Sequence, residues 1–349
     1  MSINQEYGKV CVVGCGIIGL STAIVIQQQN PNTHVTIIAD KLSPDTTSDG
    51  AAGLWEPKLE GGRSHQDNQM SDWILRTGKY LESITQSKES VAASVTILSG
   101  YYLSNKQEQL DDCSEKFYGC RKLDAKEMTA FFPNYSNGWL LTSFQVEGRT
   151  YRSKSFRFKE NGGNLVKRRL NSISEIFGEY DIIVNCAGLG AGKLVNDDSV
   201  HPIRGQVIRV KAPWVKHFII DIDDKYDGSV HIIPCRNTVL VGKSVQKNNW
   251  NLKVDKNDRK EIWRSAVNMF PSISHAELDH EWVGLRPGRP TVRLERETIN
   301  IDGNIVPIVH NYGHGGRGVS MSWGCAEDAA KLVQDIIDEE KQRTIKSKL

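Results

Sequence analysis

The sequence predicts an α/β fold whose dinucleotide-binding domain is assembled from segments that lie far apart in the chain. A β-branched run at residues 9–13 predicts a buried strand, GCGIIG (residues 14–19) a tight turn, and residues 20–29 a helix. A second buried strand at residues 34–40 completes a β-α-β unit. Further glycine-rich turns near residues 188 and 315 also follow strand-like runs. The wide spacing of these three turns predicts a cofactor domain that is discontinuous in sequence.

The remaining elements follow in chain order. Helical spacing at residues 68–85 makes Trp73, Ile74 and Leu81 candidate core positions. The other expected elements are a strand at 94–103, a strand, turn and helix at 180–194, strand-like runs between 217 and 242, and a closing helix at 324–340. The predicted ranges are 1–60, 155–200 and 300–340 for the cofactor domain, 61–154 and 201–299 for a substrate domain, and 341–349 for an exposed tail.

Composition excludes several classes of protein. Lysine and arginine number 44 against 42 acidic residues, a net charge of +2, so nothing indicates attraction to nucleic acid or to a membrane surface. No apolar run reaches the roughly 18 to 20 residues that span a bilayer, and the N-terminus lacks a signal-peptide pattern. The seven cysteines form no CxxC pair, and we expect reduced thiols and no metal site.

The first glycine turn has the pattern G-x-G-x-x-G at Gly14, Gly16 and Gly19. The first glycine permits the tight turn, the second lets the backbone approach a pyrophosphate, and the third lets helix pack on strand. The helix N-terminus then presents free N–H groups and a partial positive charge to the phosphates. Asp40 stands 21 residues after Gly19, where a carboxylate accepts hydrogen bonds from ribose hydroxyls. The motif does not distinguish NAD from FAD.

Long stretches in family order resemble the D-amino-acid oxidase and D-aspartate oxidase family of FAD enzymes. They are VVGCGIIGLSTA, PDTTSDGAAGLWEP, IIVNCAGLGAGKL, IRGQVIRVKAPWVKHF, WVGLRPGRPTVRLERE and HNYGHGGRGVSMSWGCAEDAAKLV. The resemblance implies a Rossmann-like FAD-binding domain and a substrate domain on a mixed β-sheet. It also implies hydride transfer from the substrate Cα to flavin N5, giving a 2-oxo acid, ammonia and hydrogen peroxide from a small D-amino acid and O2.

The same resemblance assigns cofactor-binding residues along the chain. A helix N-terminus beside flavin N1 and O2 would stabilise the charge of the reduced ring. The implied residues are Gly14, Gly16, Ile17, Ile18 and Gly19 at the pyrophosphate; Asp40 and Lys41 near the ribose; Thr46, Thr47 and Ser48 along the phosphates and ribitol; Gly53 and Leu54 beside the ring; Cys186, Ala187 and Gly188 near the adenosine; and Gly315, Gly316, Gly318, Val319 and Ser320 under the ring's pyrimidine edge.

Substrate recognition points to arginine, because only a guanidinium binds a carboxylate bidentately. GLRPGRP supplies Arg286 and Arg289, and the resemblance favours Arg286. It also places Tyr226 and Gly316 at the site. His231 stands where the family usually has a second tyrosine, and a histidine there would still donate a hydrogen bond.

Substrate preference stays open between neutral and acidic D-amino acids. Val245 and Ile220 stand where D-aspartate oxidases carry basic side chains, which argues against a simple transfer of aspartate specificity. Arg317 or Lys58 would supply a replacement cation, unless Arg317 faces solvent or a carboxylate such as Glu56. The alternatives are a D-aspartate oxidase proper, a family member that binds FAD with weak or no turnover, and an NAD(P)-dependent dehydrogenase on the same N-terminal fold.

Two further segments, residues 151–163 and 347–349, lead to predictions about structure and location. The basic stretch YRSKSFRFKENGG (151–163) stands where the family has an amphipathic helix, and its sequence leaves open whether that helix forms. The final tripeptide Ser347, Lys348 and Leu349 matches an address read by the peroxisomal import receptor, so we expect a peroxisomal matrix protein. Its expected oligomeric state is a monomer or homodimer.

Overall fold

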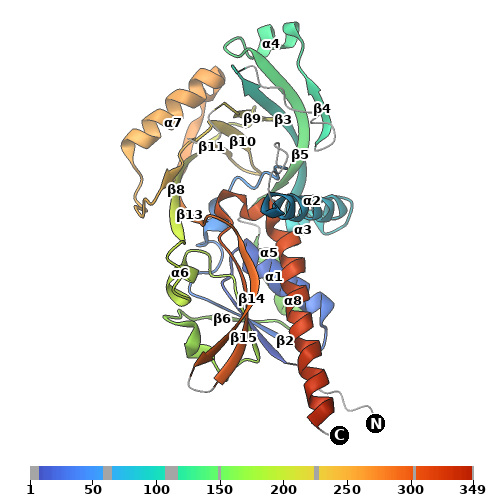
Figure 1. Ribbon diagram of the computed structural model, residues 1–349. Helices are drawn as coiled ribbons and strands as arrows, with labels where there is room; N and C mark the ends of the chain where they lie inside the picture. Colours follow the sequence, from blue (N-terminus) through green and yellow to red (C-terminus); the bar gives the residue numbers. More distant parts are fainter. Residues whose placement is uncertain are drawn as a thin grey trace.

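Two β-sheets organise the chain, each with its own hydrophobic core (Figure 1). The computed structural model describes residues 8–57, 65–106, 117–147, 151–223, 228–301 and 304–347. In Figure 1 the sheet that contains β1 and β2 lies in the lower half, and the sheet that contains β8 and β10 lies in the upper half.

The first sheet has the strand order β14-β15-β7-β1-β2-β6. Its strands pair in parallel, except for the antiparallel hairpin of β14 and β15. Because the carboxyl ends of parallel strands share one edge, the turns after β1, β7 and β15 meet there. The bounds are β1 (Lys9–Val13), β2 (His34–Ala39), β6 (Asn164–Lys167), β7 (Ile182–Asn185), β14 (Arg293–Ile301) and β15 (Asn304–Tyr312).

Helices α1 and α8 pack together against the core of this sheet, and α2 packs on α8. A Cβ on Gly324 would stand 2.4 Å from the carbonyl oxygen of Trp73, so only glycine permits this close helix approach. Nearby, the rings of Tyr80 and Trp323 stack at 3.5 Å. The bounds are α1 (Ile17–Gln29), α2 (His65–Thr85), α3 (Ser90–Ala93), α5 (Tyr151–Glu160), α6 (Gly190–Leu194) and α8 (Gly318–Ser347).

The second sheet is mixed, with the order β12-β8-β11-β10-β9-β3-β5-β4 and β13 paired to β8. β3 and β9 pair in parallel, and the other pairs are antiparallel. The strands are β3 (Val95–Ser104), β4 (Tyr118–Lys122), β5 (Asn137–Val146), β8 (His201–Lys211), β9 (Phe218–Asp221), β10 (His231–Pro234), β11 (Val239–Gly242), β12 (Gln246–Lys247) and β13 (Glu277–Gly288). Helices α4 (Ala125–Phe131) and α7 (Lys256–Met269) accompany it.

The structure adds detail to three of the predicted domain ranges. β14 begins at Arg293 and pairs with β15, so residues 293–299 join the first sheet rather than the substrate domain. α2 contributes Trp73, Ile74 and Leu81 to a core cluster that contains residues of both sheets, because this helix packs on α8 and also on β3 and β5. Helical spacing shows that a face is apolar but not which core receives it. The exposed tail is also helical, because α8 continues to Ser347.

Residues 151–160 form the helix that the sequence left open, and this helix packs on α1. Phe158 is fully buried in the first core, while Phe156 is exposed. The amide of Gln27 donates to the Phe158 carbonyl at 3.2 Å, and Arg157 forms an ion pair with Glu89. One buried aromatic and these tertiary contacts therefore replace the missing apolar stripe.

The cysteines depart from expectation at one position. Cys120 is disulfide-bonded, whereas we expected reduced thiols throughout. The free thiols among the described residues are those of Cys11, Cys15, Cys186, Cys235 and Cys325. Scattered spacing without a CxxC pair therefore did not exclude a disulfide.

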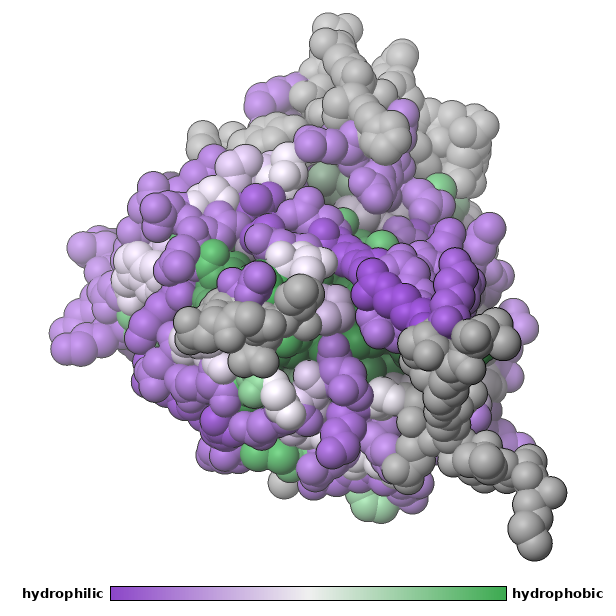
Figure 2. All heavy atoms as spheres, turned by 60° about the horizontal axis from the view of Figure 1, so that its bottom comes forward, coloured by the Kyte–Doolittle hydropathy of each residue, from purple (hydrophilic) through white to green (hydrophobic). Residues whose placement is uncertain are grey.

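The molecular surface is largely polar on the face that Figure 2 shows. Figure 2 shows hydrophilic residues over most of this face, with hydrophobic ones mainly in recesses. Within the described ranges, no helix is long and apolar enough to cross a membrane.

Candidate active site

The turn between β1 and α1 is held by close backbone contacts. Gly14 has a φ of +110°, and a Cβ there would stand 2.4 Å from the Cys186 carbonyl oxygen. A Cβ on Gly19 would stand 2.0 Å from the Gly14 carbonyl oxygen. Gly16 differs, because its nearest neighbour would be the Ser48 hydroxyl at 3.3 Å. Gly14 and Gly19 therefore fix the turn, while Gly16 keeps the N-terminus of α1 accessible.

The N-terminus of α1 offers an anion site. Its first turn contains no acidic residue, and Gly16 supplies no side-chain cap. The Ile17 N–H donates to the Ser48 hydroxyl at 3.0 Å, and Ile18 packs against the first core. Free N–H groups at a helix start favour a phosphate, so this turn fits the dinucleotide that the motif predicts.

Residues 46–48 reach this turn because Asp49 holds their loop. The Asp49 carboxylate accepts from the Thr46 N–H at 2.9 Å and from the Ser43 hydroxyl at 2.6 Å. Thr47 donates to the Leu285 carbonyl at 3.2 Å, on strand β13 of the other sheet. The loop thus places Ser48 at the start of α1 and ties the two sheets together.

The other expected adenosine-side residues lie along the same edge. Cys186 follows β7 and donates its N–H to the Val13 carbonyl at 2.9 Å. Burial raises the pKa of its thiol to about 12, so it is a neutral packing group. Ala187 and Gly188 continue this turn, with Gly188 at a φ of +57°. Asp40 and Lys41 follow β2 and are exposed.

The second glycine turn adjoins the first. After β15 the chain turns through Gly315, at a φ of +56°, and a short 3₁₀ segment (residues 315–317) leads into α8. A Cβ on Gly318 would stand 3.8 Å from Ile17 Cγ2, so the starts of α1 and α8 lie in contact distance. Val319 packs against the first core, and Ser320 is buried.

The expected flavin-side residues Gly53 and Leu54 adjoin the second sheet. Gly53, at a φ of +75°, accepts the Val146 N–H at 2.8 Å, and Leu54 bridges to Gln145. The next peptide is tied to α8, because the Glu56 N–H donates to the Ser320 hydroxyl at 3.1 Å. Residues 53–56 therefore join the second glycine turn to the substrate sheet.

His314 stands in the second turn with an unused polar atom. Its side chain is buried, and its Nε2 finds no hydrogen-bond partner among the described residues. Burial lowers its pKa to about 3, so the ring is neutral at physiological pH. A buried polar atom without a partner is costly, and the polar atoms of a bound cofactor would satisfy it. The residues at both turns therefore fit FAD.

This buried ring predicts acid sensitivity. An unfolded histidine has a pKa near 6.5, so as pH falls below that value the unfolded chain binds a proton that folded His314 does not. We expect His314 to remove about 1.4 kcal/mol of unfolding free energy between pH 7.5 and 5.5. Chemical denaturation of flavin-free wild type and His314→Gln at both pH values measures it. Equal losses in the two proteins would contradict this prediction, since His231 and His310 titrate in both.

The two arginines of GLRPGRP have different surroundings. Arg289 donates to Asp197 at 2.9 Å and to the Thr291 carbonyl at 2.9 Å. Arg286, on β13, donates only to the Ser244 carbonyl, at 3.4 Å, and no carboxylate pairs with it within the described chain. Burial lowers its pKa. Arg289 is thus structural, and Arg286 holds an uncompensated positive charge.

Glycines make room for Arg286 at the junction of the sheets. A Cβ on Gly205 would stand 2.4 Å from its Nη1, and one on Gly316 would stand 3.5 Å from its Cδ. Gly316 belongs to the second glycine turn, so the free guanidinium lies beside the expected flavin site. A desolvated cation of this kind suits a small carboxylate ligand.

His231 has a fixed tautomer. Burial lowers its pKa, with Arg286 acting in the same direction. Its Nδ1 lies 2.9 Å from the Ser229 carbonyl, which only accepts, so the neutral ring carries its proton on Nδ1. Nε2 is then an acceptor. A neutral His231 would therefore accept a hydrogen bond through Nε2, so the expected donation to a substrate carboxylate would need the protonated ring.

Two functional candidates escaped the sequence reasoning, which treated Glu56 only as a carboxylate for Arg317. Tyr102 is fully buried on β3, and its hydroxyl donates to Glu56 Oε1 at 2.7 Å. Arg317 is exposed and forms no ion pair among the described residues, yet it lowers the pKa of Tyr102 while Glu56 raises it. The inward position of Tyr102 in the alternating strand GYYLS was the available signal.

Several predicted residues lie outside the described ranges. They are Lys58, Tyr226, Lys348 and Leu349; of Ser347, only the backbone at the end of α8 is described.

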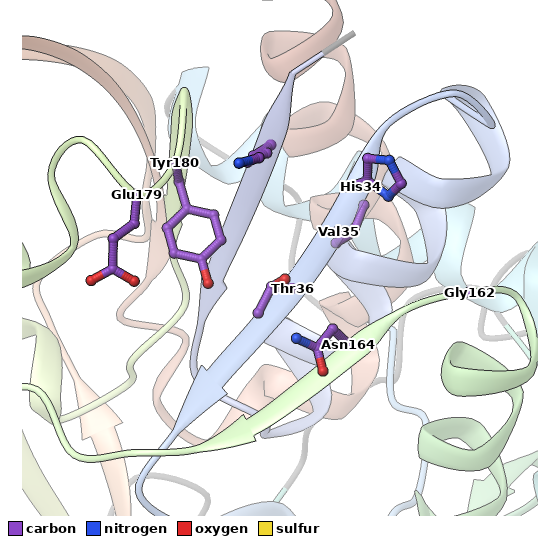
Figure 3. Close-up of a pocket in the computed structure, with 8 residues that line it drawn as sticks. His34, Val35, Thr36, Gly162, Asn164, Glu179 and Tyr180 are labelled. Carbon is purple, nitrogen blue, oxygen red and sulfur yellow. The ribbon is translucent and has the colours of Figure 1, made fainter. Parts of the chain in front are cut away.

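A cavity of about 330 Å³ lies away from this site (Figure 3). Its lining includes Thr36, Asn164, Glu179 and Tyr180, near the amino ends of β2 and β6. The glycine turns follow the carboxyl ends, where ligands bind in open α/β sheets. This cavity is therefore not the dinucleotide site.

The fold and the paired glycine turns define a dinucleotide-dependent oxidoreductase, with the buried Arg286 beside the second turn. The chain belongs to the DAO family, described as FAD dependent oxidoreductase, whose model matches residues 9–332. It is 38% identical to "D-aspartate oxidase" of Homo sapiens, covering 95% of this chain and 96% of that protein. It is 34% identical to "D-amino acid oxidase" of Dugesia ryukyuensis, covering 94% and 98%.

Solved structures share the fold. Glycine oxidase from Geobacillus kaustophilus superposes with a TM-score of 0.74 at 17% identity, over 96% of this chain and 95% of that chain. L-alpha-glycerophosphate oxidase from Mycoplasma pneumoniae superposes with a TM-score of 0.71 at 15% identity, over 95% of both chains. The predicted Rossmann-like α/β fold with a mixed second sheet is confirmed, and FAD is the cofactor of the family.

Proposed function

We propose that this chain oxidises D-amino acids with FAD, giving a 2-oxo acid, ammonia and hydrogen peroxide. The observation that carries the proposal is Arg286, a buried cation without a carboxylate partner in the described chain, beside the flavin turn. Relatives named D-aspartate oxidase and D-amino acid oxidase, at 32–38% identity, support it.

The chain's own residues act mainly by orientation. Bound FAD would supply the hydride acceptor for the substrate Cα–H and a route for the electrons to O2. Arg286 would hold the α-carboxylate and so orient the substrate Cα–H, and the start of α8 would stabilise negative charge on the reduced cofactor. The neutral Nε2 of His231 adds an acceptor near Arg286. This mechanism needs no protein base, because the substrate binds with its amino group uncharged.

A peroxide assay on a panel of D- and L-amino acids tests the function. Purified protein should be yellow and should release peroxide from D-amino acids only. If flavin-loaded protein yields no peroxide from any D-amino acid, the chain is better described as a family member that binds FAD without turnover. A colourless, NAD(P)-dependent activity would favour the dehydrogenase.

The finer proposal is that Arg317 supplies a side-chain cation for acidic substrates; Lys58 is the other candidate. Arg317 is exposed, stands in the flavin turn and acts electrostatically on Tyr102. We expect Arg317→Ala to raise KM for D-aspartate about tenfold more than KM for D-alanine, the size of one partly exposed charge contact. Steady-state kinetics with both substrates measures this, and equal changes would remove Arg317 from that role.

We also propose a peroxisomal location and recognition of Ser347, Lys348 and Leu349 by the import receptor. A peroxide-producing oxidase suits a compartment that destroys peroxide. Imaging the full chain against a variant with Leu349→Ser checks the proposal: only the first should enter peroxisomes.

A further inference from the structure

Glu56 is a carboxylate that hydride transfer does not require, and it is held at both ends. Its N–H donates to the Ser320 hydroxyl at 3.1 Å, and its Oε1 accepts the Tyr102 hydroxyl at 2.7 Å. Ser320 is buried at the start of α8, and Tyr102 is fully buried on β3. The side chain therefore has a fixed place between the flavin turn and the substrate sheet.

Glu56 and the substrate arginine, Arg286, have neighbours in common. Ser320, which accepts the Glu56 N–H, lies in the first turn of α8, directly after the segment that contains Gly316. A Cβ on Gly316 would stand 3.5 Å from Arg286 Cδ. The charges of Glu56 and Arg286 also act on the same buried ring: Glu56 raises the pKa of His231, and Arg286 lowers it. A D-amino acid whose carboxylate binds Arg286 would therefore lie within the electrostatic influence of Glu56.

Glu56 forms no ion pair among the described residues, and its carboxylate accepts a hydrogen bond from a neutral phenol. Its hydrogen-bond donor, Tyr102, stays uncharged, because burial and Glu56 raise the pKa of the phenol well above its ordinary value. Arg317 acts on Tyr102 with the opposite sign, but it is exposed and forms no ion pair with Glu56. A partly buried charge is screened less than an exposed one, so Glu56 acts more strongly than Arg317 at this point.

We propose that Glu56 sets the side-chain preference of the site, favouring D-amino acids with a basic side chain and disfavouring those with an acidic one. The inference rests on the proposed function and names its substrate class. Glu56 and Arg317 then have opposite effects, and Glu56, the better fixed of the two, dominates. D-lysine or D-arginine should be a better substrate than D-aspartate at neutral pH.

The holoenzyme with Glu56→Gln tests the charge alone, because glutamine keeps an oxygen for Tyr102. We expect kcat/KM for D-lysine to fall about tenfold relative to D-alanine, and that for D-aspartate to rise about tenfold, mainly through KM. Tyr102→Phe is the matched control: it keeps the carboxylate and removes the hydrogen bond, so the order of substrates should persist. A uniform change for all three substrates in Glu56→Gln would overturn the proposal.

A binding measurement keeps this test separate from the proposed function. Changes in flavin absorbance on anaerobic titration with D-lysine and D-aspartate report affinity without turnover. The role of Glu56 is supported if wild type binds D-lysine more tightly than D-aspartate and Glu56→Gln loses this preference. This result holds even if no peroxide forms. Equal affinities in wild type would overturn the role of Glu56, whether or not the protein is an oxidase.

Discussion

Arg286→Ala should lower kcat/KM for every D-amino acid by about 10²- to 10³-fold, because removing one partner of a desolvated charge pair costs about 3–4 kcal/mol. The buried guanidinium of Arg286 has no carboxylate partner in the described chain, so its binding capacity is reserved for a ligand. Arg286→Lys should recover only part of the loss, since an ammonium does not bind a carboxylate bidentately. Steady-state peroxide kinetics measures all three proteins.

Arg289→Ala is the matched control from the same GLRPGRP motif. Arg289 is paired with Asp197, and Tyr312 donates to the same carboxylate oxygen at 2.8 Å. Its loss should lower thermal stability and leave the ratio of activities among substrates unchanged. The assignment fails if Arg289→Ala loses carboxylate affinity while Arg286→Ala retains it. Absorbance of bound flavin in both variants separates lost substrate binding from lost cofactor.

Local patterns predicted the parts of the site that depend on neighbours in sequence. The strand, the glycine turn and the helix at residues 9–29 lie next to one another in the chain, so periodicity and glycine spacing were sufficient. The difference between Arg286 and Arg289 was not visible, because it depends on Asp197, which a separate segment supplies. The resemblance to a family favoured Arg286, and the contacts of each guanidinium explain why.

Other features depend on contacts that the sequence does not encode locally. Glu56 and Tyr102 meet only because residues 53–55 lie against β5, which pairs with β3. The proton on His231 Nδ1 is set by one carbonyl, whose direction follows from the backbone rather than from residue type. Long-range pairing likewise decided the position of β14 and the core joined by α2. Charge and tautomer at the site were therefore accessible only from the structure.

Gly14→Ala and Gly16→Ala should separate the folding role of the first turn from its cofactor role. At Gly14 a methyl group meets the Cys186 carbonyl oxygen at 2.4 Å, and φ is +110°. We expect a loss of about 3 kcal/mol or more in the stability of the flavin-free protein. Gly16 has a φ of −72°, which alanine adopts freely, and its nearest contact would be the Ser48 hydroxyl at 3.3 Å, which needs to shift only slightly. Its replacement should leave that stability nearly unchanged.

Gly16→Ala should nevertheless raise the Kd for FAD about tenfold or more, because its methyl group occupies the approach of the pyrophosphate to the backbone. Thermal denaturation of flavin-free protein and fluorescence titration with FAD measure the two effects. Gly19→Ala should resemble Gly14→Ala, since its Cβ would stand 2.0 Å from the Gly14 carbonyl oxygen. If Gly16→Ala unfolds the protein as readily as Gly14→Ala, the N-terminus of α1 is not kept open for a ligand. The three glycines are identical in the motif, so only their contacts determine which one serves the fold and which one serves FAD.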